Sequence, residues 1–514
     1  MKKSVKLVLS ALAVYLVLLL LLLAAESTAP DASIRSFGDA IWYSLVTMTT
    51  VGYGDLSPVT PLGRILGTVF ALCSVGILTA LIGVGLHLIS GAFLPRQRLR
   101  QGRRKKWYAF SAESPEAAAL AAALQKEEPG CLLIFPEGEE KRVSGSGVVR
   151  TEFDLPLLLR LKGGDKGLAF FYMGAEPWDN YNRALASAKA GIDSYCMADL
   201  AAEQLPPELQ LFSPTEVMSR SYWKAHPLTA GERTVVFIGG GTVGTALLER
   251  ALLTNVLEKG RTIRYHVFGA DSTFSTLHPE IMKALSGENE AEDSLCFHME
   301  DWTEARTLLQ QADRILICGD GEAENHSVYE RLKSWYVSTA HVHVYLTEPV
   351  PGIDSFGGLA DSFTPEFVMK DELNRRAVLM NDIYNEGAAQ PTAWRDLSPF
   401  LRQSNIAAAD HLIVKARYLL GDDGLTELSD DDCHRAYARF IELRQEQADL
   451  LQEMEHRRWL RFYQMYNWQY APVRDNALRR HPLMVEYKDL SPEDRKKDAY
   501  AWEMLGRLGE SRGI

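Results

Sequence analysis

The run Thr49-Thr50-Val51-Gly52-Tyr53-Gly54-Asp55 lies between two long apolar segments near the N-terminus. Gly52 and Gly54 permit backbone conformations that a β-carbon would penalise, so successive carbonyl groups can point the same way. Several copies of the run around one axis would stack these carbonyls into rings, and the Thr50 hydroxyl would add another. Such rings replace the water shell of a dehydrated cation. The alternative is a glycine-rich turn that matches this pattern by chance.

The same run resembles the selectivity filter of potassium channels, TVGYG followed by Asp, and departs from it at none of these positions. The resemblance implies a filter made of Thr50, Val51, Gly52, Tyr53 and Gly54. Potassium ions would bind at the first four of these residues. The residues that it assigns to the support of the filter are Trp42, Tyr43 and Asp55. It also implies a homotetramer, whereas the residues alone require only more than one copy.

Two apolar segments frame the filter, Leu7 to Ala25 and Leu62 to Phe93. About 20 apolar residues cross a bilayer as a helix. The stretch from Phe37 to Met48 between them is typical of a short helix that enters the membrane and returns, which requires cover by protein or water. We therefore expect residues 1–95 to form an α-helical pore domain with two spans and a re-entrant pore helix. A cleaved signal peptide is the alternative for the first segment, although its apolar core exceeds the roughly 7–15 residues usual there.

The linker 96–106 contains seven basic residues and no acidic residue. The positive-inside rule places such a linker, and with it both termini, in the cytoplasm of a multi-pass protein of the bacterial inner membrane. An arginine-rich voltage sensor would need further spans, so we expect the gating signal to come from the cytoplasmic part. Gly76 and Gly83 in the second span are candidate gating hinges, and close helix packing is an equal alternative for both.

Strands alternate with helices from residue 107 to about residue 370, which predicts parallel sheets in two α/β Rossmann-like domains. In the first domain, 107–228, the opening strand is followed by Ser111–Ser114 instead of a glycine-rich turn. The phosphate loop of a dinucleotide fold is therefore degenerate there. The second domain, 229–370, has a strand from Thr234 to Ile238 that leads directly into a glycine-rich turn and a helix.

That turn contains the pattern G-x-G-x-x-G at Gly239, Gly241 and Gly244. The first glycine allows the turn, the second lets the backbone approach a pyrophosphate, and the third packs the helix on the strand. Phosphate would lie at the helix N-terminus. Asp271, after the next strand, is the candidate partner of a ribose hydroxyl, so NAD(H) or an adenine nucleotide is the expected ligand. Asp320, Glu322 and Glu324, after a later strand, form an acidic loop that faces either solvent or a ligand or cation, and solvent is favoured.

Residues 107 to about 367 resemble two consecutive RCK-type (TrkA-N-like) domains. The resemblance is closer for the second copy, which has the glycine motif. It implies a cytoplasmic ring that regulates potassium conductance.

Residues 371–449 are expected to be a helical connector, with one helix from Asp431 to Leu451. A small, mainly α-helical domain follows at 450–514. Its pattern E-H-x-x-W, a later Trp and the triplet R-H-P resemble the RyR domain of ryanodine receptors. A purine could stack on an aromatic helix face while basic groups bind its phosphate; the alternative is that the aromatic residues form the core. The candidate residues for this ligand face are His456, Trp459, Tyr463, Trp468, Arg474 and His481.

The formal charge of −12 argues against a nucleic-acid polymer as partner. Six cysteines are scattered without a CxxC pair, so neither a zinc site nor a disulfide framework is expected; haem is not expected either. The sequence favours a ligand-gated potassium channel, not an enzyme, whose small-molecule ligand is nucleotide-like. A non-conducting membrane sensor or scaffold and a membrane-anchored NAD-dependent enzyme are the alternatives.

Overall fold

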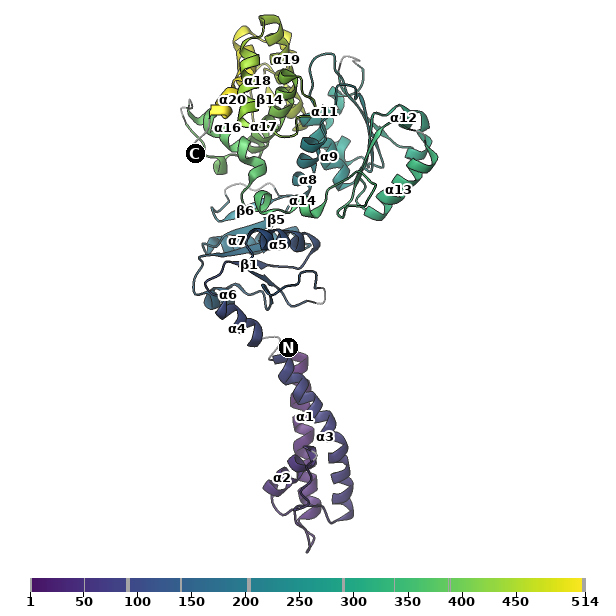
Figure 1. The fold of residues 1–514 in the computed structure, drawn as a ribbon, viewed down its shortest axis with the longest axis vertical. Helices are drawn as coiled ribbons and strands as arrows, with labels where there is room; N and C mark the ends of the chain where they lie inside the picture. Colours follow the sequence, from purple (N-terminus) through teal and green to yellow (C-terminus); the bar gives the residue numbers. More distant parts are fainter. Residues whose placement is uncertain are drawn as a thin grey trace. The chain divides into compact units, whose positions relative to one another are not determined.

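The structure is a computed structural model, and it describes residues 2–49, 51–88, 93–138, 141–200, 205–288, 292–336, 338–386, 388 and 390–510. The chain forms two compact units. The first contains Met1–Arg103 with Val149–Thr151, and the second contains Arg104–Val148 with Glu152–Ile514. Each unit is described by itself below, and Figure 1 labels their elements.

The first unit consists of helices that pack around a small apolar core. The helices are α1 (Lys2–Glu26), α2 (Phe37–Met48), α3 (Pro61–Leu88) and α4 (Leu94–Gln101). Leu22 of α1, Ala40 of α2 and Phe70 of α3 belong to that core. Within the described residues, no helix combines the length and the apolar character that crossing a membrane demands. The two membrane spans therefore stay a prediction.

The second unit begins with a six-stranded sheet in the order β3-β2-β1-β4-β5-β6. Its central strands are apolar and buried over their whole length, as in parallel sheets that are covered on both faces. The strands are β1 (Trp107–Phe110), β2 (Leu132–Phe135), β3 (Val148–Arg150), β4 (Leu168–Tyr172), β5 (Ser194–Met197) and β6 (Leu209–Phe212). The helices of this domain are α5 (Pro115–Glu127), α6 (Leu155–Lys162), α7 (Pro177–Lys189) and α8 (Pro214–Ala225).

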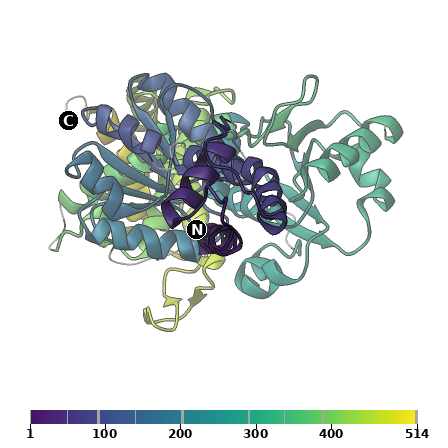
Figure 2. The same ribbon diagram turned by 90° about the horizontal axis from the view of Figure 1, so that it is seen from below.

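The second sheet has the order β12-β11-β10-β7-β8-β9. Its strands are β7 (Thr234–Ile238), β8 (Arg264–Phe268), β9 (Ser294–His298), β10 (Arg314–Ile317), β11 (His341–Tyr345) and β12 (Ser355–Phe356). The helices between these strands are α9 (Thr242–Thr254), α10 (Thr273–Leu277), α11 (Pro279–Ala284), α12 (Arg306–Gln311) and α13 (Glu322–Trp335), with a 3-10 turn η2 (Trp302–Glu304). In Figure 2 this part, coloured teal to green, forms a lobe at one side of the second unit.

Both sheets place their strands in the order third, second, first, fourth, fifth, sixth. This is the doubly wound order of dinucleotide-binding folds, in which ligands bind where the order reverses, beside the first strand. The prediction of two Rossmann-like α/β domains is thus confirmed.

Two buried asparagines show that the two domains repeat one structure. The Nδ2 of Asn180 donates to the carbonyls of Gly174 and Met197, at 2.8 and 3.1 Å. The Nδ2 of Asn325 donates to Gly319 and Tyr345 at the same two distances. In each copy these bonds join the end of the fourth strand to the end of the fifth.

The remaining chain is mainly helical. Its elements are α14 (Leu359–Ser362), α15 (Pro365–Val368), η3 (Glu372–Asn374), α16 (Arg375–Glu386), η4 (Trp394–Asp396), α17 (Pro399–Leu420), α18 (Asp430–Ile441), α19 (Gln445–Met465), β13 (Gln469–Tyr470), β14 (Arg480–His481), η5 (Tyr487–Asp489) and α20 (Pro492–Glu510). The single helix expected over 431–451 was wrong, since α18 ends at Ile441 and α19 begins at Gln445. No glycine or proline marks that break. α19 continues through position 450, where the RyR-like segment was expected to begin.

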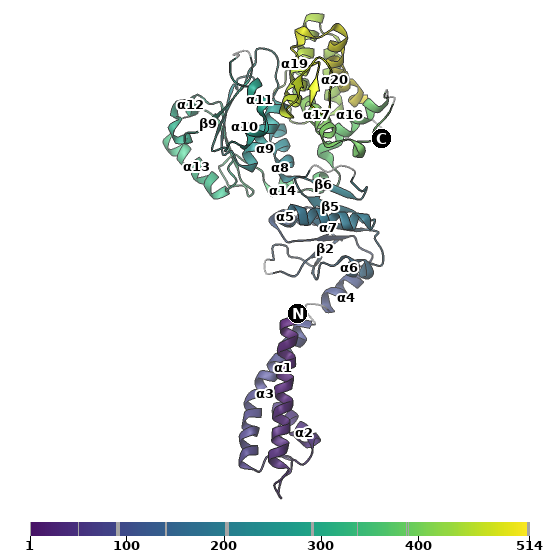
Figure 3. The same cartoon turned by 180° about the vertical axis from the view of Figure 1, so that it is seen from behind.

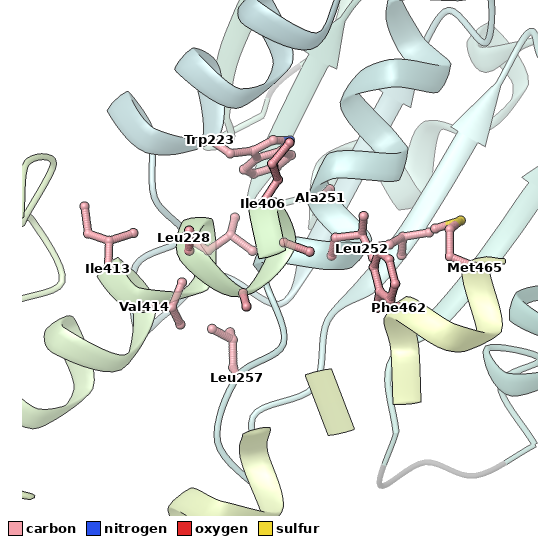
Figure 4. Packing of buried hydrophobic residues seen from close by; sticks show 14 of the residues in the cluster. Trp223, Leu228, Ala251, Leu252, Leu257, Ile406, Ile413, Val414, Phe462 and Met465 are labelled. Atoms are coloured by element: carbon pink, nitrogen blue, oxygen red, sulfur yellow. The ribbon is translucent and has the colours of Figure 1, made fainter. Parts of the chain in front are cut away.

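The C-terminal helices share one apolar core with the second sheet's helix layer. Figure 4 shows this core between α8, α9, α17 and α19, with labelled residues Trp223, Leu228, Ala251, Leu252, Leu257, Ile406, Ile413, Val414, Phe462 and Met465. Figures 1 and 3 both show α11 beside α19. α9 therefore packs directly against the C-terminal helices.

The segments between the domains cross over. Trp223 of α8, which follows the first sheet, is buried in the core of the second domain and donates a hydrogen bond to the carbonyl of Leu247 in α9. Phe363 and Val368, which follow the second sheet, are buried against the first sheet's core. This exchange ties the two domains together.

Candidate functional site

The filter segment adopts the backbone that its glycines allow. Gly52 has a φ of +57° and Gly54 a φ of +75°, in the left-handed region that residues with a β-carbon rarely adopt. The amides of Val51 and Gly52 both donate to the carbonyl of Val46, at 3.1 and 3.2 Å. These bonds fix the filter to the C-terminal end of α2. Thr50, predicted to bind potassium with its neighbours, lies outside the described residues.

The predicted supporting residues divide their roles. The indole Nε1 of Trp42 donates to Asp55 Oδ2 at 2.8 Å. The Trp42 ring also stacks on that of Tyr53, with 6.2 Å between centroids and 3° between planes. Tyr43 instead faces α3, where a β-carbon on Gly67 would come within 2.7 Å of its hydroxyl. Trp42 therefore contacts the segment after Gly52, and Tyr43 contacts α3, while their support of a filter stays a prediction.

The loop that follows the filter is anchored to the end of α1. The buried carboxylate of Glu26 accepts hydrogen bonds from the amides of Val59 and Thr60, both at 2.9 Å, and from the Thr60 hydroxyl at 2.7 Å. A β-carbon on Gly63 would lie 1.9 Å from Glu26 Oε1, so a larger residue there would push the carboxylate aside. Sequence reasoning missed this anchor because its members are more than 30 residues apart.

The candidate hinges, Gly76 and Gly83, lie within α3, which continues through both positions without a break. Their role as hinges or as packing positions stays a prediction.

The glycine-rich turn of the second domain is closely packed by backbone on every side. Gly239 has a φ of +119°, and a β-carbon there would lie 2.3 Å from the amide nitrogen of Gly319. A β-carbon on Gly244 would lie 1.9 Å from the carbonyl oxygen of Gly239. The turn therefore brings β7, β10 and α9 together as closely as a phosphate-binding turn requires.

The carboxylate of Asp320 lies at the N-terminus of α9. Oδ2 accepts from the amide of Thr242 at 3.1 Å, and Oδ1 accepts from the amide of Val243 at 3.0 Å. A β-carbon on Gly241 would lie 2.3 Å from Asp320 Oδ2. Because unpaired amides and the helix dipole attract anions at this end of a helix, Asp320 binds where a phosphate would bind.

Asp271 follows β8 at the same edge of the sheet. Its Oδ1 accepts from the amide of Thr273 at 2.8 Å, and this bond lowers the pKa of the exposed carboxyl. The neighbouring Ala270 lies against the glycine turn, since a β-carbon on Gly240 would come within 2.3 Å of it. The structure thus places Asp271 beside the turn, and its role as a ribose ligand stays a prediction.

The first domain closes the equivalent helix end with its own residues. The Ser114 hydroxyl accepts from the amide of Ala117 at 3.1 Å, and Pro115 occupies the first turn of α5. A proline has no amide hydrogen to offer a phosphate. The N-terminus of α5 therefore offers fewer free amides to a phosphate than the N-terminus of α9. This agrees with the degenerate phosphate loop expected in the first domain.

The residues of the expected RyR-like ligand face come together between α19 and β14. Trp459 and Tyr463 have ring centroids 4.1 Å apart, and His481 lies 5.0 Å from Trp459. Trp468 lies 5.0 Å from Tyr463 on another side. Phe400 of α17 stacks on Trp468, a contact that the local sequence did not indicate.

Most of this aromatic cluster is buried, and several polar groups within it are engaged. Nε2 of His456 donates to the carbonyl of Val485 at 2.8 Å, and its Nδ1 lies 3.4 Å from the carboxylate of Asp498. Nδ1 of His481 accepts from the amide of Leu483 at 3.1 Å. Burial and the positive charge of Arg474 lower the pKa of His481 to about 4, so its ring is neutral at pH 7. These contacts favour a structural role for both histidines.

Arg474 lies on the exposed loop between β13 and β14 and donates to Asn476 Oδ1 at 2.9 Å. Its charge reaches Tyr463 as well as His481. Of the six predicted face residues, Trp459 and Arg474 are the accessible ones. A ligand at this cluster would therefore meet mainly these two.

Residues 7–90 match the family described as Ion channel. They contain the first predicted span, the predicted filter segment and most of the second predicted span. Curated relatives that match this part of the chain include potassium channels. The voltage-gated potassium channel of Aeropyrum pernix is 50% identical over 54 residues, which cover 10% of this chain and 18% of that one. The human potassium voltage-gated channel subfamily A member 10 is 47% identical over 60 residues, 12% of this chain and 11% of the relative. The chain thus spans less than a fifth of the length of these relatives.

Solved structures of the GsuK channel are also similar. GsuK bound to ADP has 16% identity and a TM-score of 0.30, and the likeness covers 66% of this chain and 90% of that one. GsuK bound to NAD has 12% identity and a TM-score of 0.34, with 74% and 86% covered. TM-scores this low do not establish a shared fold.

Proposed function

We propose that the chain is one subunit of a potassium-selective channel that a nucleotide gates from the cytoplasmic side. The filter segment is the observation that supports potassium selectivity. Its two glycines have left-handed backbones, and Asp55 and Tyr53 are both held by Trp42. Carbonyl rings in such a filter coordinate dehydrated potassium, and the ion channel match covers this segment.

The filter needs further copies of the chain. In the single chain the side chains of Val51 and Tyr53 are 53% and 69% exposed, and Trp42 is 45% exposed. Large apolar and aromatic groups that stay this exposed indicate a contact surface. We propose that four copies cover it around one axis, as in the potassium channels that the filter resembles.

The nucleotide is proposed to bind at the N-terminus of α9. The doubly wound order puts the end of β7 at the reversal point, and the glycine turn leaves the first amides of α9 to an anion. NAD(H) and adenine nucleotides carry a pyrophosphate or triphosphate that these amides can bind. Asp271 is the proposed acceptor of a ribose hydroxyl. These groups become available to the nucleotide once Asp320 leaves the amides of α9.

Asp320 supplies the switch in this proposal. A phosphate and the Asp320 carboxylate cannot both occupy the amides of Thr242 and Val243, because both are negative. Nucleotide binding would release Asp320 and the loop between β10 and α13. A ligand shifts a gate only by binding one state better than the other, and the release of Asp320 makes the two states different.

The C-terminal helices are proposed to couple to this movement. They pack on α9 in a common core, so they respond to α9 without binding the nucleotide themselves. The RyR-like aromatic cluster is the second candidate ligand site, favoured by the partly accessible Trp459 and by Arg474, whose charge acts on Tyr463 and His481. Trp459→Ala would change gating and ligand-induced thermal shifts if a ligand binds there. It would leave nucleotide binding at α9 intact.

One experiment separates the proposed function from its alternatives. The purified full chain is reconstituted in liposomes, and potassium and sodium fluxes are measured with and without NAD or ATP. Potassium-selective, barium-blocked flux supports the channel, whereas a scaffold or an anchored enzyme gives none. Gly241→Asp places a second carboxylate against Asp320, and it should abolish the nucleotide response while selectivity remains.

A further inference from the structure

We propose that His266, Cys296 and His298 form a binding site for a divalent transition-metal ion, with zinc as the best-suited ion. Each residue offers one ligand atom, a ring nitrogen or the thiol sulfur, and these three atoms lie within 4.8 Å of one another. The nitrogens that face each other are Nδ1 of His266 and Nε2 of His298. The site lies in the second sheet, away from the glycine turn of the proposed nucleotide site.

Strand register brings the three residues together. β8 and β9 are parallel neighbours, and His266 lies opposite Cys296 while Phe268 lies opposite His298. Side chains two apart on a strand share a face, so Cys296 and His298 join His266 on one side of the sheet. β9, labelled in Figure 3, is the outermost strand of this sheet. Cys296 is exposed there, so an ion can enter from solvent.

The distances require little adjustment for a metal. Nδ1 of His266 and Nε2 of His298 are 2.9 Å apart. Zinc binds nitrogen at about 2.0–2.1 Å and sulfur at about 2.3 Å in tetrahedral sites. Ligand atoms in such sites are roughly 3.3–3.8 Å apart by these bond lengths. A small opening between the two rings would therefore admit an ion.

Contacts with neighbouring residues fix the orientation and the proton of the His298 ring. Nδ1 of His298 lies 2.9 Å from Glu300 Oε1, so it holds the proton, and Nε2 has its lone pair directed at His266. A histidine ligand that donates its other N–H to a carboxylate is typical of metal sites. The His298 ring is further fixed by stacking on Phe268, with centroids 4.3 Å apart.

The hydrogen bond between the two rings agrees with this arrangement. In the metal-free protein His266 donates its Nδ1 proton to Nε2 of His298. A bound ion would take the place of that shared proton, with the proton moving to Nε2 of His266 or to solvent.

The ligand set selects the class of ion. Two imidazoles and a thiolate suit zinc and neighbouring transition metals, whereas magnesium and calcium prefer oxygen ligands. Three protein ligands leave a fourth tetrahedral position for water or for a group from another molecule. The absence of a CxxC pair in the sequence did not exclude this site. His266 and Cys296 are 30 residues apart, and only the pairing of the parallel strands β8 and β9 brings them together.

The test uses the full-length chain, purified without a histidine tag and titrated with Co²⁺ as a spectroscopic substitute for zinc. We expect one tightly bound ion per chain with a thiolate-to-cobalt charge-transfer band, which zinc displaces. Cys296→Ser should abolish that band. Glu300→Gln should weaken zinc binding about 10- to 100-fold, since it removes the partner of a histidine ligand. His326→Gln, an exposed histidine outside the cluster, is the matched control and should change neither result.

Thermal melts of the metal-free variants should show that each remains folded, because Cys296 and Glu300 are exposed. A wild-type chain that binds cobalt without a thiolate band, or not at all, would overturn the proposal. So would a band of undiminished intensity in the Cys296→Ser variant.

Discussion

The carboxylate of Asp320 and the amide of Val243, 77 positions apart in sequence, are joined by a 3.0 Å hydrogen bond at the N-terminus of α9. With the second bond to Thr242, this contact places an anion of the chain itself on the proposed phosphate site. A nucleotide phosphate that binds here would have to displace the Asp320 carboxylate. In the proposed mechanism, gating follows from that displacement.

Asp320→Asn should tighten nucleotide binding. A carboxylate on a helix N-terminus contributes about 1 kcal/mol, and a nucleotide no longer has to displace it. The expected gain in affinity is about fivefold, by the conversion of about 1.4 kcal/mol per factor of ten. Binding of labelled NAD and ATP to the full chain measures it. Asp301→Asn, which removes a carboxylate from the amide of Thr303 in the same domain, is the control; equal affinities in both variants and wild type would rule out competition by Asp320.

Gly244→Ala should destabilise the second domain strongly. Its β-carbon would meet the backbone oxygen of Gly239 at 1.9 Å, and backbone cannot move aside as a side chain can. Overpacking of this kind costs about 1–3 kcal/mol or more. Gly231→Ala is the control, since nothing lies within 4 Å of its new carbon. Urea unfolding of both variants gives the comparison, and matching midpoints would contradict the close packing of the turn.

Trp42→Phe should disturb the filter without emptying the space beside Tyr53. The substitution keeps an aromatic ring but removes the donor to Asp55. We expect reduced selectivity for potassium over sodium in liposome flux. Tyr43→Phe, which removes a hydroxyl facing α3, should preserve selectivity. If the two variants behave alike, the Trp42–Asp55 bond does not hold the filter.

The stability of the second unit should fall as the pH is lowered. Burial and the charge of Lys415 hold the pKa of His411 well below its usual 6.5, and Nε2 of His411 donates to the carbonyl of Val256. The unfolded chain therefore takes up a proton below about pH 6.5 that the folded chain does not, which destabilises the fold. Urea midpoints measured from pH 7.5 to 5 should decline, and His411→Gln should flatten this part of the decline.

A second decline is expected near pH 4.5. Burial opposes ionisation of Glu455, but Arg458 and Lys415 outweigh it and hold the pKa of this carboxyl far below its usual value. Stability from this group is present above about pH 4.5 and is lost below it. Glu455→Gln leaves buried Lys415 and Arg458 without their anion and should cost about 3–5 kcal/mol at pH 7. A cost below 1 kcal/mol would show that the cluster is not buried as described.

Local patterns in the sequence predicted the local structure well. The apolar runs at 107–110 and 234–238 are β1 and β7, and Phe37–Met48 is α2 to the residue. The alternation of strands and helices predicted both sheets. It could be recognised because apolar residues repeat every second position in a strand and about every 3.6 positions in a helix. The break between Ile441 and Gln445 had no proline or glycine to mark it, so it was missed.

Contacts between distant segments were beyond this reasoning. Asp320 was recognised only as part of an acidic loop, because nothing near it in sequence indicates that α9 lies beside it. The same holds for Glu26 and the Thr60 loop, and for His266 and Cys296. Helical spacing grouped His456, Trp459 and Tyr463, and the RyR resemblance added Trp468 and His481. Neither indicated the contact of Trp468 with Phe400 from another helix. Filter, hinge and ligand-site roles stay predictions.

The central claim is a potassium-selective pore that a nucleotide opens or closes by displacing Asp320. The most direct measurement is potassium flux from liposomes containing the full chain, titrated with NAD and with ATP, in wild type and in Asp320→Asn. The account predicts potassium-selective flux that responds to at least one of the two nucleotides, with a half-maximal concentration about fivefold lower in the variant. Flux that is unselective, or that responds to neither nucleotide in either protein, would contradict it.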